Sequence, residues 1–336
     1  MLCSVIGDEA MRFQFLLDDS KLTELEKVKY RQLVYANAAG EESYGMSDSV
    51  LMGSLKTLSS LLEKHYGKKV ILLIDEYDVP LAKAGEHGYY KEMALLLRNL
   101  LQQALKTNDS LYFAVMTGCL RTAKESIFTG LNNPKILSVT TVRFDEYFGF
   151  TDDEVKELLT YYGLEQKYEV MKSWYDGYRF GNVDVYCPWD VISYCDELTD
   201  DITAEPRDYW INTSGNDVVR RFMEKLGNGL AKRELEALVA GEAVTKEIHE
   251  ELTYYNLYDS IENIWSVLYM TGYLTCREKP RGKLFQLVIP NMEIRNIFTS
   301  QIMERFIEGV EEDKDQLDAF CSALKNGGAA EAEAFR

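Results

Sequence analysis

The pattern of apolar and polar positions predicts a helical beginning to the chain. Apolar residues recur at helical spacing along about 22–34 and again along about 47–66. Gly67 follows the second stretch, at the place where a helix commonly ends on a glycine with left-handed backbone. A further stretch with the same spacing runs from about Tyr89 to Lys106. We therefore expect three helices before residue 107.

Two nearly continuous apolar runs alternate with these helices and predict strands. They are Lys69–Ile74 and Leu111–Thr117, and a shorter run at Lys135–Val139 predicts a third strand. Runs without polar alternation are typical of strands that are buried on both faces. Strands that alternate with helices indicate a parallel sheet. We expect an α/β domain with a parallel sheet of at least three strands.

The regular alternation ends after residue 150. Thr151 and Glu154 form a capping box, which predicts a helix to about Tyr161. The segment 164–208 is rich in Trp and Tyr, Arg179–Val183 is typical of a tight hairpin turn, and Pro188 suits the first turn of a helix. These signals predict a second, mainly helical domain that is packed with aromatic side chains.

The next part of the chain has the outline of a winged helix. An apolar helix is expected at about 261–269, followed by strands at Gly272–Cys276 and Leu284–Ile289. The loop between them, Arg277–Lys283, carries four basic residues. A closing helix is expected from about Met292 to Glu308. Another helical stretch, around 315–324, precedes an acidic end that we expect to be solvated.

Composition narrows the class of protein. The 336 residues are 46% hydrophobic and 27% charged, which is ordinary for a globular protein. A formal net charge of −18 disfavours nucleic-acid binding by the whole surface. No apolar run is long enough to cross a bilayer, and the first residues do not resemble a secretory signal. Six cysteines without a C-x-x-C pair and three scattered histidines favour a cytoplasmic protein without a zinc site.

Two acids, Asp75 and Glu76, follow the first strand directly. Open parallel sheets bind their ligands at the carboxyl ends of their strands. A buried strand that ends in two acids is the pattern of a Walker B strand, whose first acid holds Mg²⁺ and whose second polarises the attacking water. The alternative is that the acids cap the next helix or are simply solvated. Asp78 either helps to position this site or belongs to a turn before Pro80.

Several longer motifs in one order give a more specific signal. Together they resemble the predicted AAA-ATPase-like proteins of bacteria, over about residues 21–297. The motifs are KVILLIDEYDVP (69–80), TGCLRTAKESIFTGLNN (117–133), YFGFTDDEV (147–155), WYDGYRF (174–180) and YWINTSGND (209–217). The resemblance implies a P-loop ATPase domain, a helical lid and a winged-helix-like region, with ATP and Mg²⁺ as cofactors. A nuclease-like domain of the PD-(D/E)xK type usually follows.

This resemblance sets expected boundaries along the chain. We expect a partial P-loop ATPase-like domain at 1–150, an aromatic-rich helical lid at 151–215 and a winged-helix-like module at 216–312. The acidic tail, 313–336, would then be the start of a nuclease-like domain.

The expected partner of the Walker B strand is absent from the sequence. A Walker A loop needs G-x-x-x-x-G-K-[ST], because its backbone amides cradle the phosphates. Neither Gly67-Lys68 nor Gly282-Lys283 fits this pattern. In the family the loop lies upstream of the Walker B strand, so we expect the chain to be a truncated member.

For an ATPase of this family, two further residues are candidates for contact with phosphate. Thr117 stands at the end of the second strand, where a polar sensor of the γ-phosphate is expected; the alternative is an ordinary threonine at a strand end. Arg121 suits a phosphate because a guanidinium pairs well with it, or it forms a salt bridge with Glu125 instead. Arg143 is a weaker candidate of the same kind.

The sequence therefore supports two hypotheses of function. The first is an ATPase-like protein whose nucleotide site is incomplete and whose ATP hydrolysis is weak or absent. The alternative is a non-catalytic interaction module that binds a protein or nucleic-acid partner through its lid and winged-helix-like region. Strand faces left uncovered would favour a protein partner or self-association. The Trp174–Phe180 motif either lines a ligand groove or packs a core.

Overall fold

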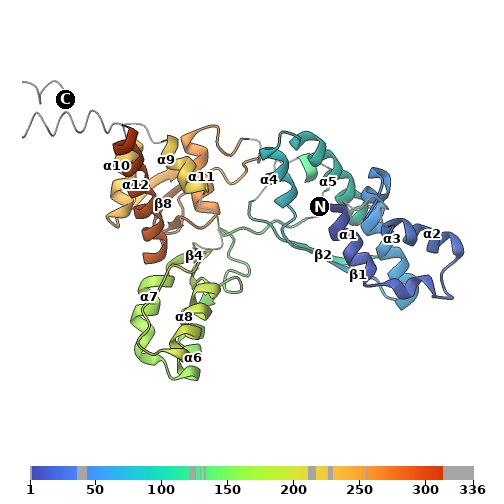
Figure 1. Ribbon diagram of the computed structural model, residues 1–336, viewed down its shortest axis with the longest axis horizontal. Helices are drawn as coiled ribbons and strands as arrows, with labels where there is room; N and C mark the ends of the chain where they lie inside the picture. Colours follow the sequence, from blue (N-terminus) through green and yellow to red (C-terminus); the bar gives the residue numbers. More distant parts are fainter. Residues whose placement is uncertain are drawn as a thin grey trace, which may run out of the picture. The chain divides into compact units, whose positions relative to one another are not determined.

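The computed structural model describes residues 2–35, 44–120, 126–128, 130–131, 134–210, 217–225, 230–254 and 256–312 (Figure 1). The chain divides into two compact units, each of which is taken by itself below. Unit 1 consists of Met1–Ile136 and Glu250–Leu257, and unit 2 of Leu137–His249 and Tyr258–Arg336. The fold of the described residues is mixed α/β, with one small parallel sheet and two small antiparallel sheets.

Unit 1 contains most of the helices and strands that the first part of the sequence predicts. Its elements are α1 (Leu2–Met11), α2 (Glu24–Leu33), α3 (Asp48–Tyr66), β1 (Val70–Ile74), α4 (Val79–Glu86), α5 (Tyr90–Leu105) and β2 (Leu111–Met116), with short 3-10 turns at Gln14–Leu17 and Ser126–Phe128. Gly67 ends α3 with left-handed backbone, as predicted. Thr23 begins α2 with a complete capping box.

The sheet of unit 1 is smaller than predicted. β1 and β2 pair in parallel, with Ile74 opposite Met116. Lys135–Val139, where the sequence predicts a third strand, is irregular, so that prediction is wrong. This stretch has only a few apolar residues and lies where the chain leaves unit 1 for unit 2. The parallel pairing itself is confirmed, but only two strands form it in the described part of this unit.

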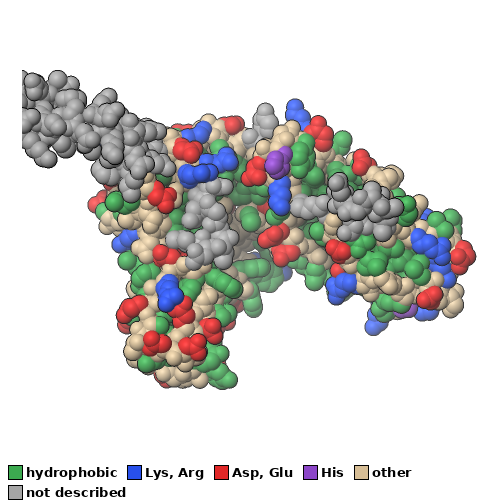
Figure 2. Space-filling view, in the orientation of Figure 1, with side chains coloured by type: hydrophobic (Ala, Val, Ile, Leu, Met, Phe, Trp, Pro, Cys, Tyr) green, Lys and Arg blue, Asp and Glu red, His purple; other side chains and the backbone are tan. Residues whose placement is uncertain are grey.

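Among the described residues of unit 1, helices cover only one face of this sheet. The apolar runs alone predict burial on both faces, whereas a sheet that lacks a strand was expected to leave apolar faces uncovered. Helices α3 and α5 pack against β1 and β2, and Ile74 and Met116 contribute to the core beneath them. The opposite face exposes 55% of Ile71 and 76% of Leu73, and their β2 partners Phe113 and Val115 are exposed as well. Figure 2 shows hydrophobic side chains at the surface of this unit between its charged groups.

Unit 2 contains the remaining helices and two antiparallel sheets. Its elements are β3 (Phe150–Thr151), α6 (Asp152–Tyr162), α7 (Tyr168–Tyr175), β4 (Tyr178–Phe180), β5 (Val183–Tyr186), α8 (Pro188–Asp200), α9 (Asp217–Lys225), α10 (Leu230–Val239), β6 (Val244–Glu247), α11 (Ile261–Met270), β7 (Thr275–Cys276), β8 (Leu284–Val288) and α12 (Met292–Glu312), with a 3-10 turn at Glu165–Lys167. The strand orders are β3-β5-β4 and β6-β8-β7.

Local sequence signals explain several of these boundaries. Thr151 begins α6 with the predicted capping box, and Pro188 stands in the first turn of α8. Phe180 pairs with Val183, so β4 and β5 form the predicted tight hairpin. The expected helix near 315–324 lies outside the described residues. No helix in the described ranges combines the length and apolar character that crossing a bilayer requires.

Two hydrophobic cores lie within unit 2. The lid core joins α6, α7 and α8 around Tyr175, Tyr186 and Tyr194, all of which are fully buried. The wing core joins α9 to α12 with the β6-β8-β7 sheet around Trp265, Phe222 and Phe298. Burial of these large side chains accounts for the aromatic-rich composition of this part of the chain.

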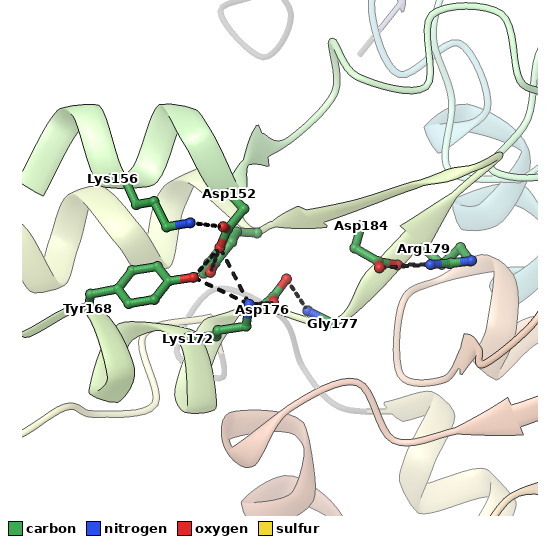
Figure 3. A network of polar contacts seen from close by, with 9 residues as sticks. Asp152, Lys156, Tyr168, Lys172, Asp176, Gly177, Arg179 and Asp184 are labelled. Atoms are coloured by element: carbon green, nitrogen blue, oxygen red, sulfur yellow. Dashed lines mark hydrogen bonds and ion pairs between the residues drawn. The ribbon is translucent and has the colours of Figure 1, made fainter.

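A network of polar contacts joins the first turn of α6 to α7 and β5 (Figure 3). The carboxylate of Asp152 accepts hydrogen bonds of 2.7 Å from the hydroxyls of both Tyr168 and Tyr186. Lys156 lies 2.6 Å from the same carboxylate, and Lys172 3.5 Å from it. Burial alone would raise the pKa of Asp152, but these partners outweigh it and hold the pKa well below its usual range.

Gly177, between α7 and β4, gives the first testable prediction. Its φ is +107°, and a Cβ atom there would lie 2.2 Å from the carbonyl oxygen of Pro290. Gly177→Ala should therefore destabilise the protein by about 2–5 kcal/mol in urea denaturation, because backbone strain and a clash with rigid backbone add.

Gly163→Ala is the matched control for this substitution. Gly163 also has left-handed backbone, with φ of +68°, but a Cβ atom would meet nothing within 4 Å. Its cost should be only about 1–2 kcal/mol. Equal losses for both variants would show that the close approach to Pro290 does not matter.

Asp152 gives the second prediction. Because its pKa is lowered in the folded protein, the carboxylate contributes stability above its unfolded pKa, near 4, and loses it as the pH falls further. Asp152→Asn should cost about 1 kcal/mol at pH 7, a modest value because the side chain is 35% exposed. Thermal unfolding of the variant should also depend less on pH below 5. Asp153→Asn, in the same helical turn, should keep the wild-type pH dependence.

Candidate functional site

The two strands of unit 1 bring Asp75 and Thr117 together at the carboxyl edge of the sheet. Asp75 follows β1, Thr117 follows β2, and both are exposed. The Thr117 hydroxyl donates a hydrogen bond to Oδ1 of Asp75. The backbone N–H of Thr117 donates to the carbonyl of Ile74 at 2.9 Å, so the ladder continues to the last residue of β1. The sheet thus places a carboxylate and a hydroxyl side by side.

Glu76 is held at the same edge by its backbone. Its φ of +51° is unusual for a residue other than glycine. The N–H of Glu76 points at Oδ1 of Asp75, at 3.1 Å, and at Oγ1 of Thr117, at 3.3 Å. The next N–H, of Tyr77, donates to the Thr117 carbonyl at 3.0 Å. These contacts fix the left-handed backbone, while the carboxylate of Glu76 remains exposed to solvent.

Asp78 is a structural anchor beneath this edge. It is only 1% exposed, and its Oδ2 accepts hydrogen bonds from the N–H of Leu120 at 3.0 Å and from the Tyr254 hydroxyl at 2.6 Å. Burial, together with the bond to Asp78, raises the pKa of Tyr254. Asp78 therefore helps to position the edge, one of the two interpretations that the sequence left open. Tyr254 could not be found from the sequence, because it is 176 residues away.

Gly118 is required by the same close packing. A Cβ atom at this position would lie 2.6 Å from the Tyr77 ring and 2.8 Å from the Asp78 carboxylate. The segment after β2 can therefore approach the beginning of α4 only because residue 118 has no side chain. Tyr77 adds a hydrogen bond of 3.2 Å from its hydroxyl to the carbonyl of Leu120.

The carboxylates make this edge electronegative. Desolvation raises the pKa of the Cys119 thiol, and the charges of Asp78, Glu76 and Asp75 raise it further. A negative potential of this kind favours a bound cation. In the described ranges, no cluster of three or more His, Cys, Asp or Glu side chains is arranged to hold a metal ion. A cation at Asp75 would therefore take further ligands from water or from a bound anion.

The remaining sequence candidates are placed unequally. Arg121 lies outside the described residues. Arg143 belongs to unit 2, where its guanidinium stacks over the Phe144 ring at 4.7 Å. In the Trp174–Phe180 motif, Tyr175 is fully buried and Trp174 packs against the lid core, which supports the packing interpretation.

The basic loop between β7 and β8 is exposed. Arg277, Lys279, Arg281 and Lys283 all reach solvent. The helix before it, α11, is buried continuously from Ile264 to Tyr269. A helix buried in this way cannot enter a DNA groove, so any contact with nucleic acid in this region would come from the loop.

Comparison with known proteins finds a family match for the part of the chain that contains Asp75 and Glu76. Residues 13–128 match the sequence model of a family described as "Predicted AAA-ATPase". A protein of Azotobacter chroococcum mcd 1, described as "Uncharacterized protein in vnfD 5'region", is 24% identical over 251 residues. That alignment covers 72% of this chain but only 44% of the relative, so the chain spans less than half of its length. No solved structure shows significant similarity. Residues 13–128, which contain β1, β2 and both edge acids, are thus similar to the predicted AAA-ATPase family.

Proposed function

We propose that the carboxyl edge of β1 and β2 is the metal-binding and water-activating half of an ATPase site. The observation that carries this proposal is the hydrogen bond from Thr117 to Asp75 at the ends of two parallel strands. It supports one site composed of residues that are 42 positions apart. The family of residues 13–128 supports ATP as the nucleotide.

Asp75 is the metal ligand in this proposal. Magnesium in nucleotide sites is commonly held by one or two carboxylates together with phosphate oxygens and water. An exposed carboxylate in an electronegative edge fits that role, and bound Mg²⁺ would neutralise phosphate charge there. Glu76, whose carboxylate is exposed beside Asp75, is the general base that orients the attacking water.

Thr117 fits the role of a sensor because its hydroxyl carries a single proton. In the structure that proton is donated to Asp75, while the oxygen accepts the Glu76 N–H. A phosphate oxygen nearby would compete with Asp75 for the same proton. Contact with the γ-phosphate would thus alter the hydrogen bonds that Thr117 makes with the metal ligand, Asp75, and with the backbone of the general base, Glu76. Arg121 remains a candidate for phosphate contact on the basis of the sequence alone.

The phosphate-binding half of the site has no counterpart in the 336 residues. None of their Gly-Lys pairs belongs to a G-x-x-x-x-G-K-[ST] loop. Without its backbone amides, a triphosphate would lack most of its hydrogen-bond donors. We infer that these residues alone hydrolyse ATP weakly or not at all.

Metal binding at Asp75 gives the third prediction. Mn²⁺, a paramagnetic substitute for Mg²⁺, should broaden the amide NMR signals of Glu76 and Thr117 before others in unit 1. Asp75→Asn should abolish this selective broadening, because the amide side chain carries no negative charge.

Asp109→Asn is the matched control, since Asp109 is an exposed acid at the opposite end of β2. It should leave the broadening at Glu76 and Thr117 unchanged. Broadening that survives in Asp75→Asn, or that is absent from the wild type, would contradict a metal site at this edge.

A second candidate function is that of an interaction module. The uncovered apolar face of β1 and β2 favours a protein partner or self-association. The four exposed basic residues of 277–283 favour the backbone of a nucleic acid, despite the negative charge of the whole chain. Neither surface contains the residues that are assigned to the proposed ATPase chemistry.

The basic loop gives the fourth prediction. If it contacts phosphate, fluorescence anisotropy should detect duplex DNA binding that weakens steeply as salt increases, since counterion release dominates such contacts. Replacement of Arg277, Lys279, Arg281 and Lys283 by Gln should remove that binding. Replacement of Lys232 and Arg233 by Gln, at two exposed positions on α10, should leave the DNA binding unchanged. Binding that is identical in both variants would exclude the loop as the contact.

A further inference from the structure

Two carboxyl groups that the proposed ATPase chemistry does not use are fully buried in unit 2. Asp190 lies in the first turn of α8 and Glu293 in the first turn of α12, and both are 0% exposed. α8 belongs to the lid core, whereas α12 belongs to the wing core. Burial of an isolated carboxylate is very unfavourable, so such a pair needs a physical explanation.

The contacts of the pair show where a proton is needed. The two carboxyl groups lie within hydrogen-bonding reach of each other. Oε1 of Glu293 accepts a bond of 2.6 Å from the N–H of Trp210. Among the described residues, Oε2 of Glu293 and both oxygens of Asp190 have no N–H or O–H donor, although the Cys187 thiol interacts with Asp190. Ionised carboxylates only accept hydrogen bonds, so the bond between them requires a proton on one of the two acids.

The surroundings of the pair discourage a second negative charge. The titratable groups that act on it are Tyr175 of α7, Tyr178 of β4, Cys187 before α8, and Asp208 before Trp210. None of these four side chains can carry a positive charge. Burial, and after it the charge of Asp190, raises the pKa of the Cys187 thiol to about 12, so this group stays protonated.

Glu293 is the acid that holds the proton. Burial, followed by the charge of Asp190 and the bond to it, raises the pKa of Glu293 to about 8. Burial also raises the pKa of Asp190, but the bond from Glu293 opposes that shift. The neutral acid therefore lies on α12, and the carboxylate that accepts its proton lies on α8.

We propose that Asp190 and Glu293 share one proton that joins α8 to α12, and that loss of this proton loosens the contact between the lid core and the wing core. With the proton, one oxygen of each acid is satisfied by a single strong bond. Without it, two like charges face each other in a dry site, and the helices relieve this by moving apart and admitting water. The pair is thus a pH-sensitive latch within unit 2.

The direction of the pH effect follows from the raised pKa. Between the usual carboxyl range and about pH 8, the folded state binds a proton that the unfolded state has released. Stability from the latch therefore falls as the pH rises through this window. The folding equilibrium constant should fall by up to about tenfold per pH unit.

Glu293→Gln provides the fifth prediction, since the amide of Gln donates to Asp190 at every pH and still accepts from Trp210. The free energy of unfolding of this variant in urea, relative to that of the wild type, should increase as the pH rises from 6 to 8. At pH 9, amide hydrogen exchange in the first turns of α8 and α12 should be slower in Glu293→Gln than in the wild type. Glu236→Gln, an exposed position on α10, is the control and should follow the wild type throughout.

Infrared spectroscopy keeps the test decisive even if the variant folds poorly. The wild type should show the carbonyl band of a protonated carboxylic acid at pH 6–7, and this band should disappear as the pH passes about 8. Absence of the band near neutral pH would overturn the proposal. So would stability curves of Glu293→Gln and wild type that stay parallel from pH 6 to 9.

Discussion

The parallel pairing of β1 with β2 is the constraint on which the candidate site depends. Because Ile74 lies opposite Met116, the residues that follow the two strands must meet. The ladder continues beyond the strands through the bonds from Thr117 to Ile74 and from Tyr77 to Thr117. The side-chain bond between Thr117 and Asp75, and the left-handed backbone of Glu76, follow from this register. A shift of one residue would turn Asp75 or Thr117 to the other face of the sheet.

Buried residues below this edge hold its exposed residues in position. Asp78 fastens the beginning of α4 to Leu120 and to Tyr254, while Gly118 leaves room for that contact. The chemistry proposed for Asp75 and Glu76 therefore depends on residues that would not touch a ligand. This division is common in functional sites, where a few exposed groups are positioned by a satisfied polar layer beneath them.

The sequence predicted the elements whose signals are local. The capping box at Thr151 located the beginning of α6, Gly67 located the end of α3, and apolar runs located β1 and β2. It failed where the outcome depends on partners. The run at β1 predicts burial on both faces, but one face has no cover in the described part of unit 1, and Leu73 is 76% exposed. No local pattern could reveal the contacts of Asp78 with Tyr254 or of Asp190 with Glu293, since each joins distant segments. Asp75 and Glu76 were found because two acids after an apolar strand are a local signal.

The proposed site has a metal half at Asp75 and Glu76, whereas its phosphate half has no counterpart in the sequence. Isothermal titration of the 336-residue chain with ATP and Mg²⁺ tests this division. The account predicts no tight nucleotide binding, because the sequence has no glycine-rich loop to supply backbone donors. Tight, magnesium-dependent ATP binding that Asp75→Ala abolishes would contradict it, since a complete nucleotide site would then lie within these residues.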